Sequence, residues 1–247
     1  MTESDWLTST DPQAMLAFLR DSGRASERKL RLFAVACCRR IWPLLTDAKS
    51  QRAVKVAEQY ADGHSTREQL QAAERTAGLA AGLGDSAASA AVCCTICEDG
   101  DAYDFANVPY FLVGRVLNHA TDAATSIHTS YSSALAARKA ERTAQAALLR
   151  DILGNPFHPL PTLAPFLLTR EITALVSVAY DKRRLPQGTL DPGLCAAVAD
   201  ALEDAREAPG CCDATLPMGR WQLVEHLRSE GPHVRRCWAL DLLLNRV

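Results

Sequence analysis

Hydrophobic side chains recur every three or four residues along most of this 247-residue chain. The clearest case begins after Ser26, where Leu30, Phe33, Cys37 and Ile41 fall on one face of a helix. The same spacing, together with capping residues at many ends, predicts further helices. The predicted helices cover about 12–20, 26–44, 48–61, 67–77, 86–97, 111–153, 169–180, 192–205, 220–227 and 232–244.

Glycine, proline and Ser/Thr clusters separate these segments, and the alternation typical of strands is absent. Residues 125–133 interrupt the long helical pattern, and the proline-rich stretch 155–165 is the best internal boundary. We therefore predict an all-α fold, with a larger N-terminal helical lobe over 1–154 and a smaller C-terminal lobe over 169–247. The connector spans 155–168, and we expect the two lobes to pack as one compact multi-helix domain.

The composition is that of a folded protein, with 48% hydrophobic and 23% charged residues. Aromatic residues make up only 6% of the chain and alanine is abundant, which suits closely packed helices. Residues 1–6 lack a basic region followed by an apolar run, and no later stretch has the pattern of a membrane span. We therefore predict a cytoplasmic protein without a membrane partner, whose nine cysteines are mostly reduced, buried thiols.

Several phrases of the sequence are distinctive and are distributed from end to end. They are Asp5–Pro12, Lys29–Trp42, Ala53–Gly63, Arg150–Phe157 and Gly231–Trp238. In these phrases the chain resembles an uncharacterised family of bacterial all-helical proteins. The resemblance implies a self-contained helical unit and a bacterial source. Because no activity is assigned to that family, the resemblance transfers no catalytic residue.

One group of cysteines has the spacing of metal ligands. Cys93 and Cys97 share a face of the predicted helix, and Cys94 and Cys97 form a CxxC pair. Such a pair is typical of a redox site or of half a zinc site. A structural zinc site needs four ligands, and the sequence holds no second CxxC. The alternative interpretation is a set of buried thiols in an Ala-rich core.

A second group combines histidine and cysteine. His233 and Cys237 lie four residues apart at the start of a predicted helix, and His226 precedes them. This spacing can chelate a metal, although too few ligands are present for a complete site. Alternatively, His233 bonds to backbone groups or to a carboxylate in the first helical turn, while Cys237 packs in the core. We therefore predict no cofactor and keep zinc as the alternative.

A polar stripe follows the predicted helix after residue 111. Arg115, His119 and Asp122 belong to it, together with Asn118 and Ser126. A histidine three residues before an aspartate can act as a general base that the carboxylate orients, so Arg115, His119 and Asp122 are the catalytic candidates. A solvated helix face is the alternative. No nucleotide-binding, metalloprotease or serine-hydrolase motif is present, which leaves open whether the chain is an enzyme.

The formal net charge of -2 argues against a general attraction to nucleic acid. Basic residues do gather near Trp42 and Trp238, as in some nucleic-acid-binding proteins. We interpret those near Trp42, on residues 28–40, as a solvated face with ion pairs to neighbouring acids such as Glu27 and Glu58. The leading prediction is a non-enzymatic interaction or regulatory module whose partner is another protein. The alternatives are a metal- or thiol-dependent enzyme using a Cys/His cluster, and a nucleic-acid-binding helical protein.

Overall fold

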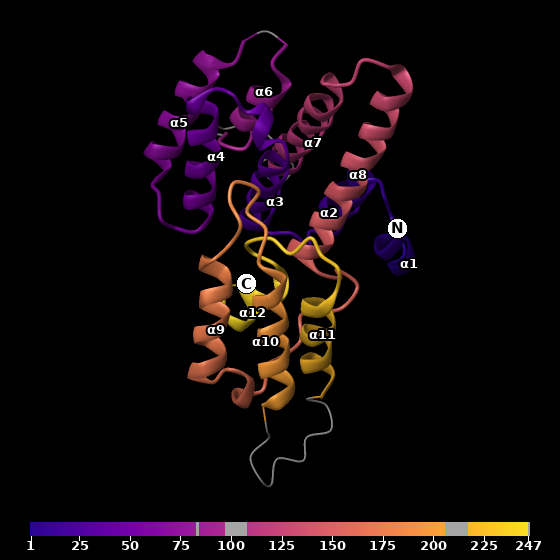
Figure 1. Ribbon diagram of the computed structural model, residues 1–247, viewed down its shortest axis with the longest axis vertical. Coiled ribbons are helices and arrows are strands. Elements are labelled where there is room, and N and C mark those ends of the chain that lie inside the picture. Colours follow the sequence, from indigo (N-terminus) through magenta and orange to yellow (C-terminus); the bar gives the residue numbers. More distant parts are fainter. Residues whose placement is uncertain (83, 97–107, 206–216, 247) are drawn as a thin grey trace. The chain divides into compact units, whose positions relative to one another are not determined.

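A computed structural model confirms the all-α fold (Figure 1). It describes residues 1–82, 84–96, 108–205 and 217–246. Within these ranges the backbone forms twelve α-helices and two short 3-10 helices. Extended pairing in the same ranges is confined to isolated bridges of Thr189 with Arg184 and with Val234. No helix in the described part of the chain is both long enough and apolar enough to cross a membrane.

The chain divides into two compact units, residues 1–150 and 151–247. The division lies in the last turn of α8, and the proline-rich stretch 155–165 belongs to the second unit. The helices of the first unit are α1 (Glu3–Thr8), α2 (Pro12–Ser22), α3 (Glu27–Arg40), η1 (Trp42–Leu44), α4 (Ala48–Ala61), α5 (Arg67–Ala80), α6 (Ser86–Cys93), α7 (Val108–Ser126) and most of α8 (Tyr131–Leu153).

Helix α3 carries much of the core of the first unit. Leu30, Phe33, Cys37 and Ile41 are all buried, as their spacing predicts. Its neighbours are α4, α6 and α7, and α4 lies beside α5 (Figure 1). The interruption predicted within the long pattern 111–153 is confirmed, because α7 ends at Ser126 and α8 begins at Tyr131.

The basic flank of α3 is only partly the solvated face that the sequence suggested, because Arg40 is exposed but other cations of the flank are buried. Arg31 and Arg39 are buried, and each pairs with one of the predicted acids. Arg39 Nη2 lies 2.6 Å from Glu58 Oε2, and Arg31 Nη2 lies 3.0 Å from Glu27 Oε1. These pairs neutralise the two guanidinium groups inside the unit, so neither is available as a surface for an anionic partner.

Helix α1 has no counterpart in the predicted elements. A capping box explains it: the Asp5 amide donates to the Thr2 hydroxyl, and the Asp5 carboxylate accepts from the Thr2 amide. Trp6 is completely buried and anchors this short helix. With one apolar anchor in six residues, the segment is too short for a helical period to show in the sequence.

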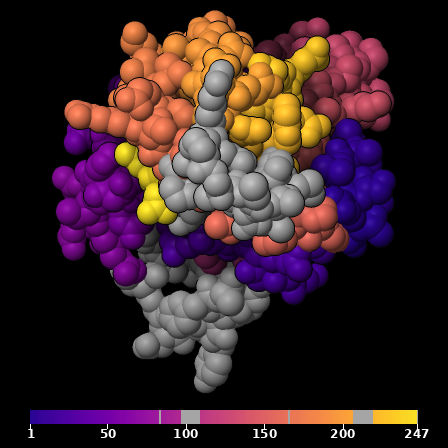
Figure 2. Space-filling model, turned by 90° about the horizontal axis from the view of Figure 1, so that it is seen from below, coloured from indigo at the N-terminus to yellow at the C-terminus, as the bar shows by residue number. Residues whose placement is uncertain are grey.

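The described residues of the second unit form the last turn of α8, four further helices and one 3-10 turn. Helices α9, α10 and α11 run side by side (Figure 1). The side chains of α10 and α11 meet at the surface of the second unit (Figure 2). Buried apolar residues of α9, α10, α11 and α12 form the core. The elements are η2 (Pro165–Leu167), α9 (Arg170–Asp181), α10 (Pro192–Asp204), α11 (Pro217–Arg228) and α12 (Trp238–Leu243).

The helix predicted over 232–244 is wrong in its first half, because α12 begins only at Trp238. The backbone of the preceding residues bonds to other segments. The His233 carbonyl accepts from the Leu190 amide at 2.8 Å, and Val234 bridges Thr189. Since these groups are engaged outside the segment, they cannot form the bonds of a helical turn. His233 and Cys237 therefore do not lie one turn apart on a helix.

Candidate metal centre

Four side chains converge inside the second unit. Asp151 comes from the last turn of α8 and His226 from the last turn of α11. His233 lies in the irregular segment 232–237, and Cys237 is the N-cap residue of α12. One potential ligand atom of each residue lies within 4.8 Å of the other three. We call Asp151, His226, His233 and Cys237 the four-residue cluster.

The separations inside the cluster are close to those of a metal site. Asp151 Oδ1 lies 2.9 Å from His233 Nδ1 and 3.2 Å from His226 Nε2. The same His226 nitrogen lies 2.9 Å from Cys237 Sγ. In a tetrahedral zinc site, ligand atoms stand about 3.4 Å apart, because the metal–ligand bonds are about 2.0–2.3 Å long. The three separations are slightly shorter than those of a tetrahedral site, and the other separations between the four ligand atoms do not exceed 4.8 Å.

Hydrogen bonds outside the cluster fix which atoms point inward. His233 Nε2 lies 3.2 Å from the Ser229 carbonyl, an oxygen that can only accept, so this nitrogen carries a proton. The Val234 amide donates to Asp151 Oδ2 at 2.9 Å. His233 Nδ1 and Asp151 Oδ1 are left facing each other, and a carboxylate oxygen also only accepts. Without a metal, a proton shared between these two atoms completes the hydrogen bond; a metal ion would take the place of that proton.

The pKa values of three cluster residues are shifted by burial and by their contacts with each other. Burial works to raise the pKa of Asp151, but hydrogen bonds and charge from His226 and His233 prevail and hold that pKa below its ordinary value. Burial works to lower the pKa of His233, yet its contact with Asp151 raises that pKa overall. Burial, together with the charge of Asp151, raises the pKa of the Cys237 thiol well above its ordinary value. In the absence of a cation, Cys237 is therefore a neutral thiol at pH 7.

The cluster is largely buried, and each of its two histidines lines a cavity, of about 290 Å³ at His226 and about 710 Å³ at His233. The side chains of Asp151, His233 and Cys237 are 4%, 7% and 0% exposed, whereas His226 is 17% exposed. The cavity at His226 lies between α11, the proline-rich stretch and Trp238. This cavity gives an ion a route to the cluster.

Gly154 packs against Trp238, whose ring contacts His226 of the cluster. It follows α8 with φ of +74°, and a Cβ at this position would lie 3.3 Å from Trp238 Cγ. The Trp238 ring in turn lies 5.0 Å from the His226 ring. Backbone conformation and close approach both favour glycine here.

Replacing Gly154 with alanine is expected to destabilise the second unit by about 1–3 kcal/mol, because it adds a left-handed non-glycine residue and a crowded methyl group. Urea unfolding followed by circular dichroism measures the change. Gly78→Ala is the matched control, since Gly78 lies in α5 with open space around it and alanine should stabilise that helix by about 0.5–1 kcal/mol. Equal effects of the two substitutions would contradict the close contact with Trp238.

The structure brings His226, His233 and Cys237 together, and it adds Asp151, which the sequence analysis missed. A signal for Asp151 was present, because it lies three residues after Leu148 and beside Ile152 on the apolar stripe of α8. A carboxylate on a buried face needs a partner. Its position in the last helical turn also opposes the helix dipole, so helix stability does not account for it.

The helix predicted over 86–97 is shorter than expected, whereas the CxxC pair of Cys94 and Cys97 stays a prediction. Helix α6 ends at Cys93, so the helical face expected to join Cys93 with Cys97 is wrong, and Cys97 lies outside the described residues. The thiol of Cys94 donates to the Ala91 carbonyl at 3.0 Å. Burial raises the pKa of the Cys93 thiol. Within the described residues, neither cysteine belongs to a group that could hold a metal.

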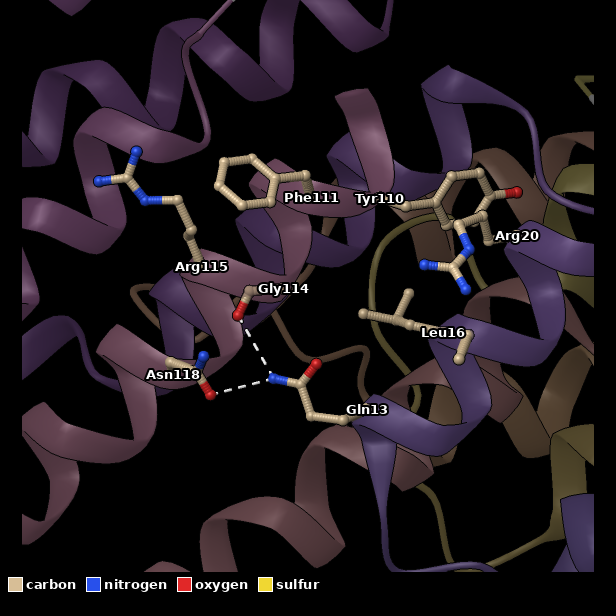
Figure 3. A pocket seen from close by; sticks show the side chains of 9 residues that line it. Gln13, Leu16, Arg20, Tyr110, Phe111, Gly114, Arg115 and Asn118 are labelled. Carbon is tan, nitrogen blue, oxygen red and sulfur yellow. Dashed lines mark hydrogen bonds between the residues drawn. The ribbon is translucent and has the colours of Figure 1, made fainter. Parts of the chain in front are cut away.

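The polar stripe of α7 divides between two environments. Arg115 and Asn118 line a cavity of about 510 Å³ between α2 and α7, where the Gln13 amide donates to Asn118 Oδ1 at 3.0 Å (Figure 3). His119 and Asp122 do not line it. Asp122 pairs with Arg138 at 2.9 Å, and burial and the charge of Arg115 lower the pKa of His119. The expected general base and its carboxylate therefore do not face this cavity.

Comparisons with known protein families, with curated proteins and with solved structures find no match to the chain. The bacterial helical family and the bacterial source stay predictions from the sequence phrases. The four-residue cluster is therefore the basis for assigning a function.

Proposed function

We propose that the second unit binds one Zn²⁺ through Asp151, His226, His233 and Cys237, and that the ion is the structural centre of a non-enzymatic interaction module. The observation that carries this proposal is the convergence of four metal-binding side chains, whose potential ligand atoms all lie within 4.8 Å of one another, with His233 Nδ1 and Asp151 Oδ1 facing each other at 2.9 Å. With zinc between them, His233 Nδ1 and Asp151 Oδ1 are both ligands. The Ser229 carbonyl and the Val234 amide then hold the two ligands from outside, as outer hydrogen bonds do in zinc sites.

The donor set favours zinc over other metals. One thiolate, two imidazoles and one carboxylate are all common zinc ligands, and four donors match its tetrahedral preference. Calcium and magnesium prefer sets of six or more oxygen ligands, which the cluster does not offer. Zinc also supplies the positive charge that stabilises Cys237 as a thiolate despite its burial.

The arrangement favours a structural role. Four protein donors complete the coordination of zinc and leave no position for a substrate or a catalytic water. The donors connect the end of α8, the end of α11 and the start of α12. A buried thiol with a raised pKa is also a poor nucleophile. These points favour the interaction module over the metal- or thiol-dependent enzyme.

Untagged protein, grown with zinc and dialysed, is expected to contain close to one zinc per chain by elemental analysis. Cys237→Ser is expected to lower this content to below about a tenth, because a hydroxyl is a far weaker zinc ligand than a thiolate. Cys195→Ala is the matched control: it removes another buried thiol of the same unit and should leave the zinc content unchanged.

Cys237→Ser also separates the metal centre from a purely hydrogen-bonded cluster. If no metal binds, a serine hydroxyl bonds to His226 as the thiol does, and the stability changes by no more than about 1 kcal/mol. A zinc content near zero in the wild-type protein, which reconstitution with Zn²⁺ does not raise, would contradict the proposal. Substituted Co²⁺ offers a further check, since a tetrahedral site with one thiolate gives visible d–d bands and one sulfur-to-cobalt charge-transfer band.

A further inference from the structure

A second feature lies in the first unit, in the groove between α4 and α5. The groove encloses about 440 Å³ and is independent of the zinc proposal. Three cationic side chains of α4 line one wall: Lys49, Arg52 and Lys55. They are spaced three residues apart and so lie along one face of the helix. The rest of the lining consists of Val56, Gln59, Ser65, Gln69, Ala72, Ala73 and Thr76.

The positive charge of this groove is not neutralised within the described residues. Lys49, Arg52 and Lys55 form no ion pair there, although the Lys55 ammonium also lies 5.7 Å from the centre of the Trp42 ring. Arg39 and Arg40, in contrast, pair with Glu58 and Glu141. The lining contains no Asp or Glu. Three like charges along two turns of one helix repel each other, and an anion bound between them relieves that repulsion.

The two glutamines of the groove are also oriented as donors. Gln59 Oε1 accepts from the Ser65 hydroxyl at 3.2 Å, and Gln69 Oε1 accepts from the Thr66 amide at 2.8 Å. Because each side-chain oxygen is engaged, the amide nitrogens are the groups left to bind a ligand. Ammonium, guanidinium and amide donors together match a ligand that consists of acceptor oxygens.

We propose that this groove binds a ligand with two or more phosphate groups and recognises it by its phosphates. The row from Lys49 to Lys55 is about 9 Å long, at about 1.5 Å per residue, which exceeds a single phosphate and suits a chain of linked phosphates. The lining contains no aromatic ring on which a base would stack. Neighbouring phosphates occur in inorganic polyphosphate, in nucleotides and, separated by sugars, along a polynucleotide backbone, so three sources can present them.

Titration calorimetry with inorganic tripolyphosphate tests the proposal. Tripolyphosphate is expected to bind at least about 10-fold more tightly than orthophosphate, because it contacts more than one cation. The triple variant Lys49→Gln, Arg52→Gln, Lys55→Gln should lose at least about 10-fold in affinity. Its side chains are exposed, and unchanged circular dichroism verifies the fold.

The control removes the same charge elsewhere. Arg75→Gln, Lys139→Gln and Lys182→Gln, combined in one variant, change three exposed cations outside the groove and should alter the affinity by less than about two-fold. No heat of binding at millimolar tripolyphosphate would overturn the proposal. Equal losses in the two triple variants would overturn it as well, because they would indicate a general charge effect.

Two further titrations distinguish the sources. If ATP binds as tightly as tripolyphosphate, the groove recognises the phosphate chain alone; tighter ATP binding that the groove variant abolishes identifies a nucleotide. A single-stranded oligonucleotide that binds more tightly than both, and loses affinity in the groove variant, identifies the polynucleotide backbone. Oligonucleotide binding that the groove variant leaves unchanged would place that interaction outside the groove and contradict this source.

Discussion

Replacing Asp151 with alanine is expected to unfold the second unit at temperatures at which the first unit stays folded. Asp151 accepts from the Val234 amide, faces both histidines and, in our proposal, binds zinc. Its removal leaves buried groups without a counter-charge, which costs about 3–5 kcal/mol before the loss of the metal is counted. For a unit of this size, about 1 kcal/mol corresponds to about 4–8 °C, so the transition should fall by at least about 12 °C.

Hydrogen exchange read by mass spectrometry measures this effect separately in each unit. Peptides from α9, α10 and α11 should lose protection in the variant, while those from α3 and α4 should keep it. Asp200→Ala is the control, because Asp200 is an exposed aspartate of the same unit that pairs with Arg228 and should contribute less than about 1 kcal/mol. Equal loss of protection with Asp200→Ala would be inconsistent with a centre built on Asp151.

Zinc affinity should fall about 10- to 100-fold between pH 7 and pH 6. The pKa of Cys237 is raised well above neutrality, so zinc displaces a proton from this thiol throughout the range, which alone gives about ten-fold per pH unit. The pKa of His233 is raised above its ordinary value, so protonation of Nδ1 competes increasingly as the pH falls. The pKa of Asp151 is lowered, so its carboxylate stays ionised and adds no dependence here.

Competition with a chelating dye at several pH values gives this slope. Stability of the metal-free protein should change in the opposite direction. Because the pKa of His233 is raised on folding, its contribution is fully present below about pH 6.5 and is lost as the pH rises through the folded value. The contribution of Asp151, whose pKa is lowered, is present above about pH 3.9 and is lost in stronger acid. Parallel slopes for zinc-loaded and metal-free protein would contradict the assignment of His233 as a ligand.

The sequence pattern predicts most of the fold because most of its helices are long and amphipathic. Helix α3 illustrates this, since the stripe through Phe33 and Cys37 is long enough to reveal its period. The pattern fails where backbone bonds to distant segments decide the conformation. Residues 232–237 have an apolar spacing compatible with a helix, but Leu190 and Thr189 engage their backbone instead. Backbone hydrogen bonds to distant segments do not produce a periodic pattern of hydrophobic residues, so the sequence does not reveal them.

The candidate site was only partly predictable for a related reason. His226, His233 and Cys237 carry recognisable ligand chemistry and lie near each other in sequence, although the helical spacing that suggested them is not how they meet. Asp151 lies far from them in the chain and could be recognised only as a carboxylate on an apolar face. Arg31 and Arg39 were expected to be exposed because they are charged. They are buried because each pairs with an acidic side chain, and the sequence alone does not show that these pairs form inside the unit.

The residues of the four-residue cluster are distributed very unevenly along the chain, with Asp151 at the end of α8 and the other three after α10. Closing so long a segment has an entropic cost, and contacts between distant residues form late in folding. During synthesis, Asp151 leaves the ribosome long before Cys237 does. In our proposal the metal centre can therefore form only after Cys237 has been synthesised, so a protein truncated before Cys237 lacks one of the four ligands.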